Sequence, residues 1–151
     1  MSETVTFRLA NAGDLPSIIA LLVDDDLGQT RESGVLSDKY KAAFEAIEAQ
    51  SGNEVIVGEF EGKVVATAQL TLIPNLTFEG SLRGQIEGVR VASSQRGRGT
   101  GEALLRWLID RAKGQGGKII QLTTNKARGD ALRFYERLGF EASHEGKKLY
   151  L

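Results

Sequence analysis

The chain has 151 residues, of which 41% are hydrophobic and 26% are charged, a composition that suits one globular domain with a sizeable core. Its 19 Lys and Arg residues nearly balance its 20 Asp and Glu residues, and the net charge of −1 excludes broad electrostatic attraction to nucleic acid or to an anionic membrane. The absence of Cys and the single His exclude disulfides, a thiolate nucleophile and the usual zinc sites, so we expect no metal.

The N-terminal part of the chain predicts a strand followed by a helix. Alternating apolar residues indicate a short strand over 5–9. Asp14 is expected to cap a helix up to Val23, because apolar residues recur there at every third or fourth position. There is no signal-peptide pattern, and the longest purely apolar run, 18–23, is far shorter than the ~20 residues that cross a membrane. These features predict a cytoplasmic protein.

The middle of the chain predicts a change from helix to sheet. Residues 24–36 lack periodicity and read as a loop, after which a second helix is expected over 37–50. Two β-rich segments, 54–60 and 63–73, are separated by Glu61 and Gly62, which indicates an antiparallel hairpin. A further strand is expected over 82–91.

The C-terminal part alternates helix and strand. An amphipathic helix follows the glycine-rich stretch at 95–101 and ends near Gly114, and a compact apolar strand follows over 118–124. A crossover of this length implies that strands 82–91 and 118–124 are parallel. The last elements are a helix from Asp130 to Leu138, stopped by Gly139, and a strand over 147–151. The order of elements predicts an α/β or α+β fold with a mixed sheet.

The glycine-rich stretch is typical of an anion site. It lies between a predicted strand and a predicted helix, where unpaired backbone N–H groups and the positive end of the helix dipole converge. Its glycines allow close approach of phosphate oxygens, and Arg96 and Arg98 add charged donors, which favours a diphosphate. A Walker loop would need Gly-Lys-Ser/Thr, and a dinucleotide fingerprint would need Gly in place of Glu102, so neither fits. A flexible turn without a ligand is the alternative.

Two segments together resemble the GNAT acyltransferase superfamily. Residues 96–101, RGRGTG, match its R/Q-x-x-G-x-G/A motif for acetyl-CoA, and residues 131–140, ALRFYERLGF, match its A-x-x-F-Y-x-x-x-G-F segment. The resemblance implies one N-acetyltransferase domain over 1–151, with a mixed sheet of about six to seven strands and about four helices. It further implies that strands 82–91 and 118–124 splay apart and that the pantetheine arm of acetyl-CoA enters between them.

The same resemblance implies a set of coenzyme-binding residues. They lie at the end of strand 82–91, in the glycine-rich stretch, after strand 118–124 and in the last helix. They are Val89, Arg90, Val91, Gln95, Arg96, Gly97, Arg98, Gly99, Thr100, Gly101, Asn125 and Phe134.

Glu87 is the candidate general base. An amine with a pKa near ~10.4 is almost wholly protonated at neutral pH, so a carboxylate or a carboxylate-bound water must take its proton. By simple alternation Glu87 shares a strand face with Val89 and Val91, and its position resembles that of the family's catalytic acid. The alternative is a structural carboxylate that is solvated or paired with Arg83 or Arg90.

Tyr135 is the candidate general acid. A phenol with a pKa near ~10 can donate a proton to a leaving thiolate, and Phe134-Tyr135 matches the motif whose Tyr has this role in the family. The alternative is a core tyrosine with a hydrogen-bonded hydroxyl. A backbone N–H of Val89 or Val91 would stabilise the oxyanion. Trp107 is expected to be core and His144 a surface residue. Residues 24–26 are expected to form a solvated helix end, with a border of the acceptor pocket as the alternative.

The sequence does not identify the molecule that accepts the acetyl group. The C-terminal third resembles aminoalkylphosphonate N-acetyltransferases, which favours a small-molecule primary amine, and Arg31 could serve a phosphonate. A protein lysine or N-terminal acetyltransferase and a non-catalytic acyl-CoA-binding regulator are the alternatives. Glu87 and Tyr135 together favour an enzyme. Because relatives in this family commonly pair through their C-terminal elements, we also expect a homodimer.

Overall fold

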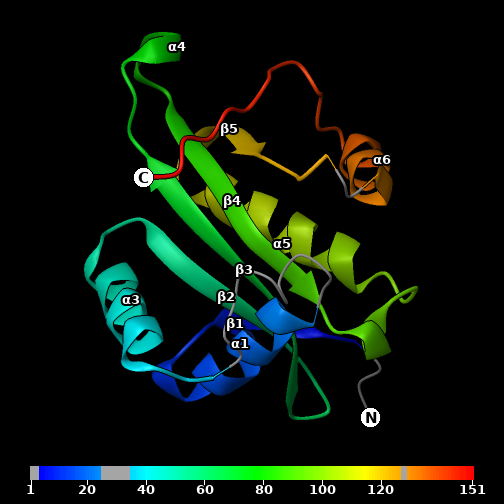
Figure 1. Cartoon of the computed structure of the whole chain (residues 1–151). Coiled ribbons are helices and arrows are strands. Elements are labelled where there is room, and N and C mark those ends of the chain that lie inside the picture. Colours follow the sequence, from blue (N-terminus) through cyan, green and yellow to red (C-terminus); the bar gives the residue numbers. More distant parts are fainter. Residues whose placement is uncertain (1–3, 25–34, 127–128) are drawn as a thin grey trace.

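One mixed sheet forms the centre of the molecule. The computed structural model describes residues 4–24, 35–126 and 129–151. The strands lie in sequence order, and the neighbours from β1 to β4 are antiparallel whereas β4 and β5 are parallel (Figure 1). The strands are β1 (Thr6–Leu9), β2 (Asn53–Phe60), β3 (Lys63–Ile73), β4 (Leu82–Val91) and β5 (Gly117–Leu122).

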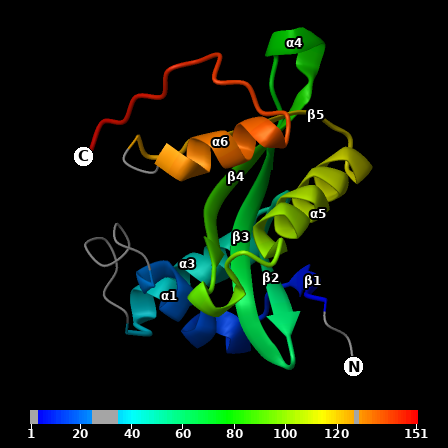
Figure 2. The same cartoon turned by 90° about the vertical axis from the view of Figure 1, so that its right-hand side faces the viewer.

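Helices cover both faces of this sheet. Helices α1 and α3 lie on one face and α5 on the other, with α6 beside the start of α5, as the two views in Figures 1 and 2 show. In the described residues the helices are α1 (Leu15–Val23), α3 (Asp38–Ala49), the single turn α4 (Thr77–Gly80), α5 (Thr100–Gly114) and α6 (Gly129–Arg137). No helix in this part of the chain is long and apolar enough to span a membrane.

Most predicted elements are confirmed, but the predicted number of strands is wrong. The described residues form five strands, not six to seven, because residues 147–151 have no strand partner. The exposed fractions of Leu149 and Tyr150 are 86% and 85%. An extended segment gains strand stability only from a ladder, and this segment leads away from the sheet (Figure 2).

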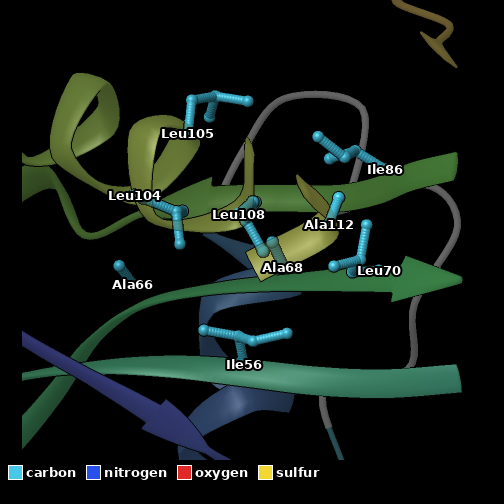
Figure 3. Packing of buried hydrophobic residues seen from close by; sticks show 9 residues of the cluster. All are labelled: Ile56, Ala66, Ala68, Leu70, Ile86, Leu104, Leu105, Leu108 and Ala112. Carbon is cyan, nitrogen blue, oxygen red and sulfur yellow. The ribbon is translucent and has the colours of Figure 1, made fainter. Parts of the chain in front are cut away.

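The hydrophobic core lies between α5 and the sheet. Leu104, Leu105 and Leu108 on one side of α5 are fully buried against apolar side chains of β2, β3 and β4 (Figure 3). Burying such side chains contributes roughly 1.5–3 kcal/mol each, so α5 is firmly fixed on the sheet. Trp107 is partly buried beside this cluster, and its ring lies 6.2 Å from that of Phe7, which confirms the packing role expected for it.

Asp14 has a different role from the predicted helix cap. Its carboxylate accepts hydrogen bonds from Arg8 at 2.7 and 2.9 Å and from the backbone N–H of Asn11. It makes no side-chain cap bond to α1, because a short 3₁₀ turn capped by Asn11 precedes that helix. The Arg8 guanidinium lowers the pKa of Asp14 and outweighs the opposing effect of burial.

We predict that acid weakens the fold through half-buried ion pairs such as that of Glu54. Arg111 donates to Glu54 at 2.7 Å and lowers the pKa of this carboxylate. Below about pH 5 the unfolded chain therefore binds protons first, so stability falls as pH falls. In urea unfolding, Glu54→Gln should cost about 1–2 kcal/mol at neutral pH and weaken this pH dependence. The exposed pair of Glu102 and Arg106 is the control, and a similar cost for Glu102→Gln would contradict the prediction.

Candidate functional site

A β-bulge at Gly88 determines which way the side chains of β4 point. Gln69 pairs with Glu87 and Thr67 pairs with Arg90, so Ala68 alone faces two residues, Gly88 and Val89. Gly88 has a φ of 62°, the left-handed conformation that a bulge of this kind requires of its first residue. The extra residue shifts the alternation of the strand by one position.

The bulge overturns the prediction that Glu87 shares a face with Val89 and Val91. Both valines pack with Ile86 against the core cluster under α5, so Glu87 lies on the face that carries α1 and α3. The side chain of Glu87 is exposed, and among the described residues it forms no ion pair with Arg83 or Arg90. This arrangement leaves the carboxylate accessible to a ligand.

The parallel pairing of β4 with β5 ends at the residue before Glu87. The last paired residues are Ile86 and Leu122, where β5 itself ends, whereas β4 continues to Val91. The bulge also leaves the backbone of Gly88 and Val89 outside the regular ladder with β3. On its other edge β4 has no strand partner beyond Ile86 among the described residues, so its backbone next to Glu87 faces an open edge there.

The glycine-rich stretch forms the predicted turn into the N-terminus of α5. Gly97 and Gly99 have φ values of 75° and 78°, and a Cβ atom at either position would meet nothing within 4 Å. A buried hydrogen bond stabilises the turn: the Thr100 hydroxyl donates to Gln95 Oε1 at 3.3 Å. The first N–H groups of α5 have no acceptor within the helix, which makes this turn a suitable anion site.

Three of the expected coenzyme residues meet at Gly101. A Cβ atom there would lie 3.5 Å from the ring of Phe134 on α6 and 3.9 Å from Val91 at the end of β4. These distances are ordinary van der Waals contacts, so α6 packs directly beside the start of α5. Tyr135 follows on α6, and its ring makes edge contacts with Phe134 at 5.2 Å and with Phe140 at 5.9 Å. Tyr135 therefore belongs to the α5 side of the sheet, opposite Glu87.

The other predicted site residues lie at several separate places around the sheet. Arg96 and Arg98 are exposed in the turn, and Asn125 is exposed after the end of β5. The side chain of Arg90 lies on the Glu87 side of β4, where its Nη1 donates to the carbonyl of Val89 at 2.9 Å. His144 is exposed, as expected, with its Nδ1 2.7 Å from the Ser143 hydroxyl. Of the proposed acidic border, Asp24 is exposed, whereas Asp25 and Asp26, like Arg31, lie outside the described residues.

The sequence analysis missed a group of uncharged polar side chains around Glu87. Gln69 is directly opposite Glu87 on β3, and Thr71, Gln85 and Gln121 continue the same face on neighbouring strands. The signal in the sequence is the alternation of polar with apolar residues along 66–72 and 83–87. Only the register across the strands shows that these residues are neighbours.

Comparison with known proteins places this chain in one family. The model of the acetyltransferase (GNAT) family matches residues 19–140. An L-methionine sulfoximine/L-methionine sulfone acetyltransferase of Pseudomonas paraeruginosa is 32% identical, over 93% of this chain and 82% of the relative. A glucosamine 6-phosphate N-acetyltransferase of Trypanosoma brucei brucei is also 32% identical, over 95% and 94% of the two chains.

Structural similarity extends over the whole chain. A crystal structure from Bacillus halodurans C-125, described as a transcriptional regulator, is 48% identical with a TM-score of 0.95, over 98% of this chain and 100% of the other. The resemblance to aminoalkylphosphonate N-acetyltransferases is confirmed over a partial stretch, since the Salmonella typhimurium enzyme is 39% identical over 61 residues, 40% of each chain. The chain belongs to the GNAT family of acetyltransferases.

Proposed function

We propose that this acetyltransferase moves the acetyl group of acetyl-CoA to the primary amine of a small molecule. The observation that carries the proposal is the separation of β4 from β5 at Glu87, with the glycine-rich turn at the far end of the same strand. A thioester held along the freed edge of β4 would be reached by Glu87 from one face of the sheet and by Tyr135 from the other.

The turn suits the diphosphate of the coenzyme. Arg96 and Arg98 supply positive charge, and the open space above Gly97 and Gly99 lets phosphate oxygens approach the backbone. The pantetheine arm would then lie against Val89 and the residues beyond it, with Phe134 and Asn125 on the opposite side. Each of these residues contributes by binding or positioning.

We expect acetyl-CoA to raise the Tm of the protein by roughly 5–10 °C at about 100 times its Kd, because it binds only the folded state. Gly99→Val should abolish this shift by placing a side chain where the diphosphate would lie. Gly62→Val is the matched control, since Gly62 has a φ of 77° and open surroundings but lies in the β2–β3 turn. An unchanged shift in Gly99→Val would place the coenzyme elsewhere.

The chain's own groups supply the proton transfers. Glu87, directly or through one water, takes a proton from the acceptor ammonium, and the free amine then attacks the thioester carbonyl carbon. An unpaired N–H of β4, most simply that of Val89, donates to the carbonyl oxygen as negative charge develops. The C–S bond breaks as the new C–N bond is completed, and the Tyr135 hydroxyl donates a proton to the departing sulfur. The nitrogen releases its second proton to solvent as the amide forms, and Tyr135 regains a proton from solvent.

A small-molecule acceptor is favoured by the relatives, whose names specify methionine sulfoximine, methionine sulfone and glucosamine 6-phosphate. The solved relative described as a transcriptional regulator favours a second candidate, a regulator that binds acyl-CoA without turnover. Release of free thiol from acetyl-CoA, measured with a panel of small amines and lysine-containing peptides, separates these functions. We expect turnover with small amines; turnover with peptides alone would indicate a protein acetyltransferase, and coenzyme binding without turnover would indicate the regulator.

We also expect a homodimer. Strand β5 lies at an edge of the sheet, and residues 147–151 carry exposed apolar side chains, including Leu151 with an exposed fraction of 114%. Pairing with a second copy would cover both features. Light scattering should give twice the monomer mass, and Leu149→Asp should weaken the association. A monomer at high micromolar concentration would rule the dimer out.

A further inference from the structure

The face of the sheet around Glu87 carries a continuous row of uncharged polar side chains. The register pairs Asn53 with Thr71, Thr71 with Gln85, and Gln85 with Gln121, so one residue of each strand from β2 to β5 lies in this row. Directly paired residues share a face of a sheet, with Cβ atoms roughly 5 Å apart. We call these four residues and Gln69, which is paired with Glu87, the polar ladder.

Hydrogen bonds between neighbours hold the polar ladder in place. Asn53 Oδ1 accepts from Gln69 Nε2 at 2.8 Å and from the Thr71 hydroxyl at 3.1 Å. On the other side, Gln85 Oε1 accepts from Gln121 Nε2 at 2.7 Å. Ordered side chains of this kind have already lost much of their rotamer entropy, so a ligand that binds them need not bear that cost again.

Each glutamine of the polar ladder keeps hydrogen-bonding capacity to spare, because a side-chain amide has two N–H groups and a carbonyl oxygen that can accept twice. Within the described part of the chain, Gln85 Nε2 has no acceptor, and the side-chain carbonyl oxygens of Gln69 and Gln121 have no donor. None of these atoms is buried without a partner, so they are open to solvent or to a ligand. Spare donors and acceptors therefore lie side by side next to the proposed base.

On β3, β4 and β5 the neighbouring positions on the opposite face are apolar. Leu70, Gly84 and Ile120 occupy the neighbouring positions and pack together under α5. A sheet face that only meets solvent usually carries charged side chains, whereas the row from Asn53 to Gln121 carries none. Uncharged amides that are bonded to one another favour a ligand with uncharged hydrogen-bonding groups.

We propose that the polar ladder binds hydroxyl groups of the acceptor, which would make the preferred substrate a hydroxylated amine. This inference rests on the proposed function. A hydroxyl both donates and accepts, so it fits the spare N–H of Gln85 as well as the spare carbonyls of Gln69 and Gln121. A carboxylate or phosphate only accepts, so it would leave the carbonyl oxygens of Gln69 and Gln121 without a donor; the cations on this face of β4, Arg83 and Arg90, lie outside the polar ladder. Gln85 lies about 7 Å along β4 from Glu87, a span that a small amine with a hydroxyl on the neighbouring carbon can bridge when hydrogen bonds of about 2.8 Å at both ends are included.

The test compares two acceptors that differ by one hydroxyl, 2-aminocyclohexanol and cyclohexylamine. The wild-type protein should prefer the hydroxylated amine in kcat/KM by roughly 10- to 100-fold. Gln85→Leu and Gln121→Leu should remove most of this preference by lowering kcat/KM for aminocyclohexanol, with little change for cyclohexylamine and for the KM of acetyl-CoA. Gln115→Leu is the matched control, because Gln115 lies at the end of α5 and bonds only Glu54.

The outcomes separate this inference from the proposed function. Transfer to both amines without a preference would overturn the role of the polar ladder and leave the acetyltransferase function intact. If neither amine is acetylated, the side-chain amide NMR signals of Gln85 and Gln121 are followed while each amine is added to the protein with coenzyme A. Shifts with aminocyclohexanol alone would support the inference, and unchanged signals would overturn it.

Discussion

Replacing Tyr135 by Phe is expected to lower kcat by roughly 10- to 1,000-fold while the affinity for acetyl-CoA changes little. The substitution keeps the ring, and with it the edge contacts to Phe134 and Phe140 that fix α6. It removes only the hydroxyl, so the departing thiolate loses its proton donor. Steady-state rates, together with acetyl-CoA binding by calorimetry, give the two quantities separately.

Tyr150→Phe is the matched control for this result. Tyr150 has an exposed fraction of 85% and lies in the segment that leaves the sheet, so its hydroxyl should not matter for the rate. If Tyr135→Phe turned over at the wild-type rate where chemistry limits the reaction, water would be the proton donor instead. The defect should persist at high pH, because abundant free amine does nothing for a thiolate that leaves without a donor.

Glu87→Gln should show the opposite dependence on pH. We expect a loss of roughly 100-fold or more in kcat near neutral pH, because the amide keeps the shape of the side chain but cannot accept a proton. As the pH approaches the pKa of the acceptor amine, near ~10.4, free amine becomes abundant and the defect should shrink. The measurement is a pH profile of kcat for the wild type and the variant with one amine.

Glu48→Gln, a change at an exposed carboxylate on α3, is the control for the Glu87 profile. A defect in Glu87→Gln that stays constant up to high pH would show that Glu87 positions the acceptor without accepting its proton. Opposite pH trends in the two active-site variants would assign the two proton transfers to different residues.

Local sequence signals predicted much of the fold and part of the site. The hairpin of β2 and β3 follows from alternation and from Glu61-Gly62, which fixes the turn. The turn into α5 follows from glycines that need a left-handed backbone, and Gly97 and Gly99 have it. These features depend on residues close together in the chain, which is why a sequence can reveal them.

What the sequence analysis got wrong depends on contacts between distant residues. The face of Glu87 is set by the pairing of Ala68 with two residues of β4; the single glycine at 88 marks a candidate bulge, but only the register with β3 shows how the bulge shifts the side chains. The polar ladder arises from the register of four strands. Likewise, 147–151 has the composition of a strand, but a strand also needs a neighbour.

The bulge of β4 offers a way to separate the backbone's part in the chemistry from that of the side chains. Gly88 is in effect a one-residue insertion, because without it Glu87, Val89 and Arg90 would face Gln69, Ala68 and Thr67 in regular order. A chain lacking Gly88 would keep every other side chain of β4 on its present side. Its ladder with β3 would close, and the extra peptide group that the bulge places beside Glu87 would be lost. Deleting Gly88 would therefore change the backbone of the site without removing any of its side chains.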